Sequence, residues 1–303
     1  MFRIRKSFLL GVMLACLGCG ACQVSQAARV ITDDRGVELT LSSPAKRIVS
    51  LYPSLTESVC LLNACDRLVG VDRSSNWPEW VQSLPHLGGM WDTSIEDLVR
   101  LKPDVVIMSY ANLKLTARLE ALGISVLIFQ PHSVLQMKRT LTSISKMVEP
   151  FDGDFQAQDN VQTLIQQIDA ELLLIQADMP PWARGRRVYL EVGSDGYAAS
   201  QGSYIGQLME QLGVVNVVPK SLGAFPKLGK EWLLKQSPEM IVFAYPRNKS
   251  FKNAPGWRVL KAVKDDHLCV LTQEQSDRLL RLGPRVAAGL KAVVECFQKM
   301  RPL

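Results

Sequence analysis

The hydrophobic and polar positions follow one pattern in two distant parts of the chain, residues 96–108 and residues 231–243. Each part opens on a glutamate, reaches a proline seven positions later, and continues with an acid and four apolar residues. This pattern predicts a short helix, a stop at the proline and then a buried strand. The repeat indicates that the chain has two similar halves.

Strands and helices alternate within each half. Residues 30–41 are expected to form a hairpin with a glycine-bearing turn. Alternation of short apolar strands with helices is typical of a mainly parallel α/β layer. Strands are predicted at 47–51, 68–71, 105–108, 126–129, 187–192, 214–215, 240–243 and 268–271, and helices at 56–62, 113–122, 134–148, 205–212, 257–263 and 286–300.

A long helix is predicted between the halves, because residues 154–178 contain neither glycine nor proline. At 1.5 Å per residue it would span roughly 37 Å, enough to reach from one lobe to the other. We therefore expect an α/β fold of two lobes with mainly parallel sheets joined by one long helix. The expected parts are a signal peptide (1–28), an N-terminal lobe (29–150), a connecting helix (151–181) and a C-terminal lobe (182–303).

The first 28 residues have the layout of a secretory signal peptide, with basic, apolar and then small residues. We expect cleavage near Ala27 or Ala28, and lipid attachment at Cys19 or Cys22 stays open as an alternative. No later stretch reaches the ~18 consecutive apolar residues of a membrane span. The sequence thus predicts an exported, periplasmic protein.

Composition and charge narrow the classes of partner. With 303 residues, 47% of them hydrophobic, the chain can bury a large core. Removing residues 1–28 takes away three basic and no acidic side chains, which lowers the formal charge from +6 to +3. No block of lysine and arginine occurs, so we do not expect a nucleic acid as partner.

Four cysteines lie beyond the predicted signal peptide: Cys60, Cys65, Cys269 and Cys296. They allow three full pairings, which the sequence does not rank. Cys269 falls in an apolar strand and Cys296 on an apolar helix face, so these two are candidates for a bridge or for buried free thiols.

Aromatic residues gather in the loops that follow the predicted strands. Ligands of open parallel sheets bind outside the carboxyl ends of the strands, and aromatic rings offer them large contact areas. Each ring could instead pack within its own lobe. The ligand-binding candidates are Tyr52, Trp77, Trp91 and Tyr110 in the first half and Tyr204, Phe225 and Tyr245 in the second.

Signatures of catalysis are scarce. The chain has no glycine-rich phosphate loop and no Gly-x-Ser-x-Gly elbow. Its histidines, His86, His132 and His267, are scattered, so no metal site is expected. We expect a binding protein without an intrinsic cofactor, not an enzyme. The alternatives are an exported α/β hydrolase and a binding fold adapted to sensing or scaffolding.

Residues 47–57, 68–71, 89–90 and 101–107 together resemble the helical-backbone (class III) substrate-binding proteins of ABC importers for cobalamin, ferric siderophores and haem. The likeness covers nearly all of the mature chain. It implies two Rossmann-like lobes with limited hinge motion and a ligand between them. It also implies an ABC permease dimer with its ATPase as the partner, and we expect the binding protein to be a monomer.

The resemblance also implies roles for four charged residues. In the family, one glutamate on each lobe's rim meets arginines of the permease, and by motif position these are Glu96 and Glu231. The helix macrodipole alone would also favour both acids. Residues 276–285 are similar to the segment by which the cobalamin-binding member meets corrin side chains, which assigns ligand contact to Asp277 and Arg281. These two residues could equally pair with each other on a solvated face.

Some positions depart from the cobalamin-binding member. Where that member has a cleft tryptophan before Gly-Met, this chain has Leu87-Gly88; its second-lobe tryptophan and first-lobe tyrosine correspond to Phe225 and Ser74. A ferric siderophore or haem therefore stays as an alternative ligand, with Tyr110, Tyr204 and His132 as candidate haem ligands. The expected function is delivery of a cobalamin-like corrinoid or a related metal chelate to an ABC importer.

Overall fold

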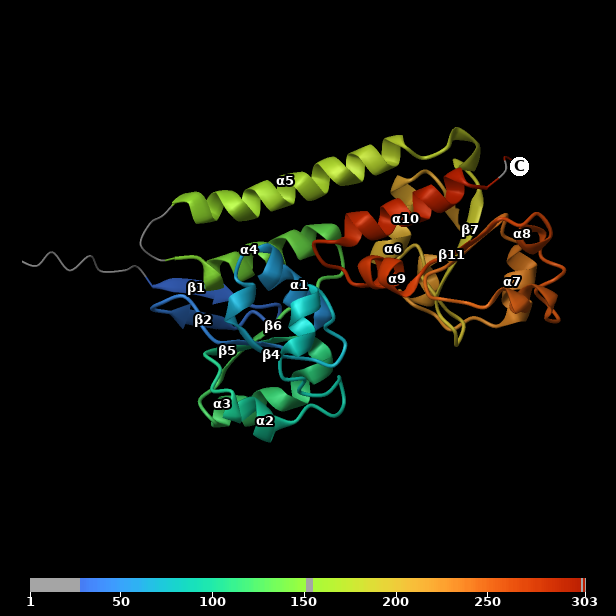
Figure 1. The fold of residues 1–303 in the computed structure, drawn as a ribbon. Coiled ribbons are helices and arrows are strands. Elements are labelled where there is room, and N and C mark those ends of the chain that lie inside the picture. Colours follow the sequence, from blue (N-terminus) through green and yellow to red (C-terminus); the bar gives the residue numbers. More distant parts are fainter. Residues whose placement is uncertain (1–27, 151–154, 301, 303) are drawn as a thin grey trace, which may run out of the picture.

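Two sheets, each surrounded by its own helices, make up the protein (Figure 1). The structure is a computed structural model that describes residues 28–150, 155–300 and 302. The predicted signal peptide, apart from residue 28, lies outside the described residues. The α/β class with two lobes and mainly parallel sheets is confirmed.

The N-terminal lobe is built on the sheet β4-β3-β5-β6, in which every neighbouring pair of strands is parallel. Its two central strands are fully buried, as expected for a sheet covered on both faces. The predicted antiparallel hairpin, β1–β2, precedes this sheet. The strands are Arg29–Thr32 (β1), Glu38–Leu41 (β2), Ile48–Ser50 (β3), Leu68–Val71 (β4), Val105–Met108 (β5) and Ser125–Ile128 (β6). The helices are Pro53–Leu61 (α1), Ile95–Arg100 (α2), Thr116–Ala121 (α3) and Val134–Val148 (α4), with 3₁₀ turns at Cys65–Arg67, Glu79–Ser83 and Tyr110–Leu115.

The C-terminal lobe repeats this arrangement with parallel strands in the order β9-β7-β10-β11, while β8 runs antiparallel to the end of β7. In each lobe the first strand of the parallel sheet lies between the second and the third. The strands are Arg187–Gly193 (β7), Tyr197–Ala198 (β8), Val215–Asn216 (β9), Met240–Phe243 (β10) and Leu268–Val270 (β11). The helices are Tyr204–Gln211 (α6), Lys230–Gln236 (α7), Lys261–Lys264 (α8), Gln273–Leu280 (α9) and Val286–Gln298 (α10), with 3₁₀ turns at Pro181–Ala183, Lys220–Leu222 and Lys249–Asn253.

The two repeated segments form equivalent parts of the two lobes. Helix α2 leads into the central strand β5, and α7 leads into the central strand β10. Lys102 and Ser237, which precede the two prolines, both have left-handed backbone angles, with φ of 46° and 44°. The helix stops there because a following proline disfavours the helical region for the residue before it.

The acid after each proline has a structural task. Asp104 accepts a hydrogen bond from the backbone N–H of Arg47 at 2.9 Å, just before β3. Glu239 accepts one from the backbone N–H of Arg187 at 3.0 Å, at the start of β7. Each acid therefore ties the first strand of its lobe to the neighbouring central strand, which explains why the pattern occurs twice.

One long helix, α5 (Phe155–Ala177), lies across both lobes (Figure 1). It packs against α4 of the N-terminal lobe and α10 of the C-terminal lobe. Lys138 on α4 forms an ion pair with Asp169, and Gln298 on α10 donates to the carbonyl of Asp178 at 2.9 Å. The predicted connecting helix is thus present. Its buried apolar stripe consists of Val161, Ile168, Leu172 and Ile175.

The structure contains two disulfides, one in each lobe. Cys60 pairs with Cys65, and Cys269 on β11 pairs with Cys296 on α10, with the Cα atoms of the second pair 5.7 Å apart. The free-thiol alternative for Cys269 and Cys296 is therefore contradicted. The second bridge fastens the edge of the C-terminal sheet to the helix that packs on α5.

Candidate functional site

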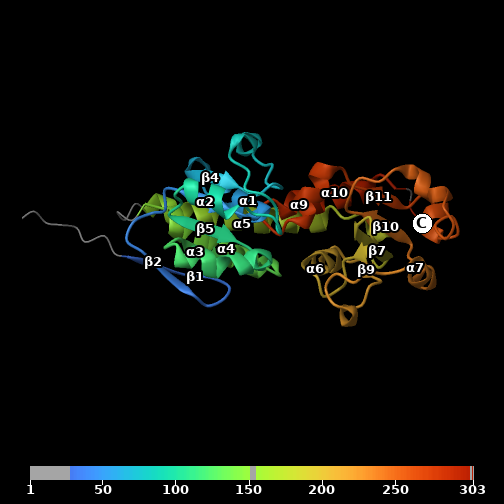
Figure 2. The ribbon, with the colours of Figure 1, turned by 90° about the horizontal axis from the view of Figure 1, so that it is seen from below.

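The two lobes meet where the start of α1 faces the corner between α9 and α10 (Figures 1 and 2). Gly283, between α9 and α10, lies so close to Ser54 on α1 that an added Cβ would be 3.1 Å from the Ser54 Cβ. Glycine thus allows a direct approach between the lobes. We call this region the lobe junction; its polar residues are Ser54, Glu57, Ser74 and Asn76 of the N-terminal lobe and Asp277, Arg281 and Arg285 of the C-terminal lobe.

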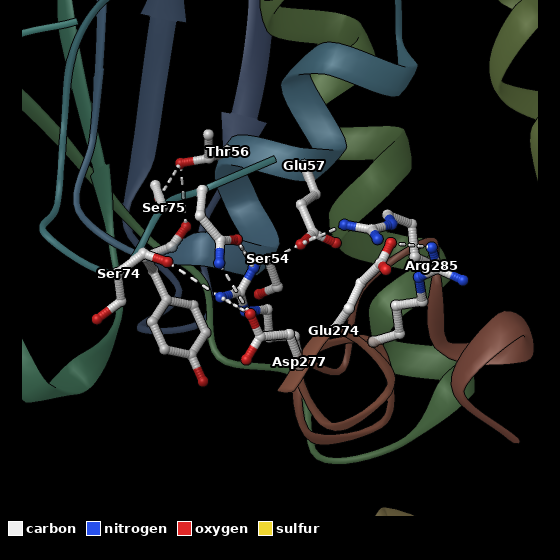
Figure 3. A network of polar contacts seen from close by, with 12 residues as sticks. Ser54, Thr56, Glu57, Ser74, Ser75, Glu274, Asp277 and Arg285 are labelled. Carbon is white, nitrogen blue, oxygen red and sulfur yellow. Dashed lines mark hydrogen bonds and ion pairs between the residues drawn. The ribbon is translucent and has the colours of Figure 1, made fainter. Parts of the chain in front are cut away.

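Arg281 makes most of the polar contacts across the lobe junction. Its Nη1 donates to Glu57 Oε1 and to Asn76 Oδ1, both at 2.8 Å. Its Nη2 donates to the carbonyl of Ser74 at 3.0 Å and to Asp277 Oδ2 at 2.9 Å. Figure 3 shows Glu57 and Ser74 facing Asp277 and Arg285 from the opposite lobe. The guanidinium therefore holds three N-terminal-lobe groups at once.

Glu57 is the most deeply buried charged group at the lobe junction, with 1% of the residue exposed. Its Oε1 accepts from Arg281 and also from Arg285 Nη1 at 3.1 Å, whereas its Oε2 is buried without a hydrogen-bond partner. Burial raises the pKa of the Glu57 carboxyl, and the two guanidinium groups oppose this shift. Closing the junction therefore buries an incompletely satisfied charge.

Asp277 and Arg281 form an ion pair one helical turn apart, with an N–O distance of 2.9 Å. The pairing that the sequence left open is present, but it is not on a solvated face. The two side chains are 16% and 13% exposed, and Asp277 also accepts from Asn76 of the other lobe at 2.9 Å. Both residues that the resemblance assigned to ligand contact thus face the N-terminal lobe.

Trp77 and Tyr52 lie on the N-terminal side of the lobe junction, and both are half-buried. The guanidinium carbon of Arg285 lies 4.3 Å from the centre of the Trp77 ring, a cation–π contact between the lobes. Burial and the nearby Asp72 carboxylate raise the pKa of Tyr52. These two candidates share their surroundings with Arg281 and Arg285.

Tyr204 and Phe225 lie on the C-terminal side. The hydroxyl of Tyr204 is within hydrogen-bonding distance of the carbonyls of Leu280 (2.5 Å) and Leu279 (3.2 Å), and burial raises its pKa. Phe225 meets the Tyr204 ring edge-on, with 6.3 Å between the centroids. Tyr204 therefore supports the end of α9, which carries Asp277, while Phe225 keeps an exposed surface.

The remaining aromatic candidates lie elsewhere. Trp91 is 78% exposed, with Lys114 Nζ 5.5 Å from its ring centre, and the Tyr110 hydroxyl donates to the carbonyl of Asp34 at 2.8 Å. Tyr245 donates to the buried Glu191 within the C-terminal lobe. The structure gives these three residues no contact with the polar groups of the lobe junction. Their assignment to a ligand stays a prediction.

Sequence reasoning missed Glu57, Asn76 and Arg285. Glu57 and Arg285 stand in the two segments that carry the family resemblance. The signal for Glu57 was an acid among small and apolar residues, whereas Arg285 is one of three arginines in its segment. Nothing local, however, identifies them as partners, because 228 positions separate them.

Glu96 and Glu231 occupy matching places in the first turns of α2 and α7. Both are exposed, and neither has a salt bridge to the residues that the structure describes. Helices α2 and α7 lie on the side of their lobes away from α5 (Figure 1). Their position is open to a partner, and their docking role stays a prediction.

No cluster of three or more His, Cys, Asp or Glu suited to a metal ion occurs among residues 28–150, 155–300 and 302. Among the described helices, none combines the length and apolarity needed to cross a membrane.

Comparison with known proteins gives a consistent set of relatives. The family model described as "Periplasmic binding protein" matches residues 48–275. An uncharacterized ABC transporter substrate-binding lipoprotein of Bacillus subtilis, YvrC, is 25% identical over 306 residues, covering 95% of this chain and 93% of that protein.

Two crystal structures show the same fold. The periplasmic vitamin B12 binding protein BtuF of Vibrio cholerae is 23% identical, with a TM-score of 0.68, over 84% of this chain and 97% of that one. A periplasmic haem-binding protein from Pseudomonas aeruginosa is 22% identical, with a TM-score of 0.68, over 86% of this chain and 95% of that one. The family match runs from the start of β3 into α9 and so includes both parallel sheets. The chain belongs to the periplasmic binding protein family.

Proposed function

We propose that this protein captures a cobalamin-like corrinoid, or a related metal chelate, at the lobe junction and delivers it to an ABC importer. The observation that carries the proposal is the Asp277–Arg281 pair, which α9 presents to Ser74 and Asn76 of the opposite lobe. If the lobes part, a carboxylate and a guanidinium become available on one side and an amide and a carbonyl on the other. These groups can donate to and accept from the amide side chains around a corrin.

Aromatic contact would supply apolar binding energy beside these polar groups. Trp77 and Tyr52 are half-buried at the lobe junction, and Phe225 is exposed next to Tyr204. Flat rings on both sides of a planar chelate would add large contact areas at low entropic cost. The chelate is cargo, and the proposal includes neither a chemical step nor a resident cofactor.

Haem and ferric siderophores are the alternative cargoes. A haem receptor needs an unengaged side chain as axial ligand, but the hydroxyls of Tyr110 and Tyr204 already contact backbone carbonyls. His132 is exposed, and among the described residues its side chain has no hydrogen bond or ion pair with the polar groups of the lobe junction. A corrinoid, whose metal can keep its own axial ligands, therefore fits the described side chains better than haem.

The proposal includes a partner and a location. Glu96 and Glu231 would meet basic residues of a permease dimer, one on each lobe, while the protein acts as a monomer in the periplasm. Export by the signal peptide, with cleavage or lipid attachment near the N-terminus, would place it there. The relatives named above, a transporter-associated lipoprotein and periplasmic binding proteins, support this location and this partner.

The proposal can be tested through the visible absorbance of the candidate cargoes. The mature protein is incubated separately with cyanocobalamin, haemin and a panel of ferric siderophores, and then passed through gel filtration. We expect the absorbance of cyanocobalamin to elute with the protein at one ligand per chain. If only haemin or only a siderophore is retained, that molecule is the cargo and the corrinoid assignment is wrong. If none of the three is retained, the proposal that the protein binds a metal chelate is wrong.

A further inference from the structure

The Cys60–Cys65 disulfide lies at the edge of the N-terminal sheet that is opposite to the lobe junction. Cys60 is the penultimate residue of α1, and the 3₁₀ turn that begins at Cys65 leads directly into β4 at Leu68. The bridge is therefore at the amino end of a parallel strand, whereas the start of α1 follows the carboxyl end of β3 and faces the lobe junction. Ligands of open α/β sheets bind outside the carboxyl ends of the strands, so the bridge lies outside the proposed ligand site.

Backbone hydrogen bonds, as well as the bridge itself, hold the two cysteines together. Asn63, just after α1, has a left-handed φ of 58°. Its N–H donates to the carbonyl of Cys60, and the N–H of Ala64 donates to the carbonyl of Val59, both at 3.1 Å. These two hydrogen bonds form the Schellman motif, which ends many helices. The motif turns the chain back on α1, where the Cα atoms of Cys60 and Cys65 are 4.0 Å apart.

A hollow of about 640 Å³ lies beside this bridge, and both cysteines line it together with Trp80 and Leu84. Cys60 and Cys65 are each half-buried, and Trp80 is 42% exposed. Thiol–disulfide exchange requires that an attacking thiolate reach one sulfur of the bridge. The hollow gives an incoming thiol room beside the Cys60–Cys65 bridge while the lobe stays folded.

The Cys269–Cys296 bridge differs in its burial. Cys269 is 0% exposed and belongs to the hydrophobic core, whereas Cys296 is half-buried and borders a cavity of about 530 Å³. A thiol that attacks Cys296 must release the sulfur of Cys269 as a thiolate inside the core. Apolar surroundings disfavour a charged thiolate, and a sulfur that ionises with difficulty is a slow leaving group. This second bridge should therefore open only when the lobe itself opens locally.

We propose that Cys60–Cys65 is a reversible thiol–disulfide exchange site whose co-reactant is a dithiol, while the second bridge stays closed. The site acts independently of the cargo at the lobe junction. The reduced form keeps its fold, because the Schellman hydrogen bonds do not depend on the sulfurs. The 3₁₀ turn that carries Cys65 is also anchored by Arg67, whose Nη1 donates to the carbonyl of Ala45 at 3.1 Å. The two thiols therefore stay close enough to form the bridge again.

The exchange proceeds in two steps. One thiolate of the dithiol attacks the sulfur of Cys60 or Cys65, so the bridge breaks, a mixed disulfide forms and the displaced cysteine sulfur takes up a proton. The second thiolate of the dithiol then attacks the dithiol's own sulfur in the mixed disulfide and releases the other cysteine, which also takes up a proton. Two electrons pass to the protein, and the dithiol becomes a disulfide. An oxidised disulfide reagent reverses both steps.

Thiol labelling over time tests the proposal. The protein without residues 1–28 carries only the four cysteines of the two bridges. The folded protein is incubated with dithiothreitol and quenched with N-ethylmaleimide at intervals, and mass spectrometry measures the label on each cysteine. Label should appear on Cys60 and Cys65 at least about tenfold faster than on Cys269 and Cys296. Equal rates, slower opening of the Cys60–Cys65 bridge, or no opening of either bridge would overturn the proposal.

Re-formation of the bridge tests reversibility and the role of the turn. After dithiothreitol is removed, oxidised glutathione should restore the Cys60–Cys65 bridge, and the far-UV circular dichroism should stay unchanged throughout. Asn63→Val disfavours the left-handed backbone and should slow re-formation about tenfold. Asn63→Gly adopts that backbone freely, so it is the matched control and should re-form the bridge like the wild type. If the wild type does not re-form the bridge, the proposal of a reversible site is wrong. If the valine variant re-forms it as fast as the glycine variant, the turn does not hold the two thiols together.

Discussion

Glu57 in the middle of α1 accepts a hydrogen bond of 2.8 Å from Arg281, which directly follows α9 in the opposite lobe. Through this contact, a buried carboxylate of the N-terminal lobe binds the arginine of the C-terminal lobe that we propose as a ligand-binding residue. Arg281 must exchange at least part of its N-terminal-lobe contacts for ligand contacts. The cost of that exchange would enter the measured affinity.

The first prediction concerns pH. Burial raises the pKa of Glu57 above its ordinary value of 4.5. A raised folded-state pKa means that the folded protein holds this proton more tightly, so the contribution is fully present below pH 4.5 and is lost as pH rises through the folded pKa. Glu57→Gln cannot ionise, and its free energy of unfolding, measured with urea, should fall less as pH rises from about 5 to about 7.

Glu96→Gln is the control for this measurement, because Glu96 is exposed. Its pH dependence should match that of the wild type. If Glu57→Gln also follows the wild-type curve, the account of a raised pKa at Glu57 is wrong.

A second prediction tests the close approach of the lobes. Gly283→Ala would place a Cβ 3.1 Å from the Ser54 Cβ. The atoms around Ser54 must give way by a few tenths of an ångström to admit the methyl group, and we expect a loss of about 1–3 kcal/mol in the free energy of unfolding. Gly193→Ala is the control, because a Cβ there meets nothing within 4 Å. If the two variants are equally stable, the lobe junction accommodates a Cβ at position 283 without cost, and the account of a close approach there is wrong.

The disulfides should contribute unequally. The Cys269–Cys296 bridge spans 27 positions of sequence and the Cys60–Cys65 bridge only 5. Loop-closure entropy predicts a loss of about 3–4 kcal/mol for Cys269→Ala/Cys296→Ala and about 2 kcal/mol for Cys60→Ala/Cys65→Ala. Chemical denaturation of both double variants under oxidising conditions measures this order. A larger loss for the short bridge would mean that strain or packing, and not chain entropy, controls the difference.

Charge reversal tests the docking surface. Glu96→Lys and Glu231→Lys should each weaken capture by the cognate permease in a pull-down, because a cation would face the permease arginines that the family resemblance implies. Ligand affinity should not change, since neither residue contacts the lobe junction. Glu210→Lys, an exposed reversal on α6, is the control for a general effect of charge. If the permease captures both variants as well as it captures the wild type, Glu96 and Glu231 do not take part in docking.

Much of the fold follows from local sequence pattern. The strands around Val106 and Val242, the connecting helix and the β1–β2 hairpin were predictable, because their apolar periodicity depends on residues a few positions apart. The repeated acid after each proline was also visible. Its contact with Arg47 or Arg187 was not, because that contact joins strands that are distant in sequence.

The site was predictable only in part, for the same reason. The segment around Asp277 and Arg281 was identified through its family resemblance, and the structure adds Glu57 and Asn76 as their partners from the other lobe. A loop after a strand indicates which edge of the sheet an aromatic residue occupies. It does not indicate where the ring points, and Tyr245 turns out to bind Glu191 inside its own lobe.

The central claim is that ligand binds at the lobe junction through Asp277 and Arg281. The most direct measurement is the dissociation constant of cyanocobalamin for the wild type, Asp277→Asn, Arg281→Gln and the exposed control Arg258→Gln, taken from the change in its absorbance. We predict at least about tenfold weaker binding for both junction variants, because a charge-assisted hydrogen bond is lost, and no change for the control. Wild-type affinity in folded Asp277→Asn and Arg281→Gln would contradict the account.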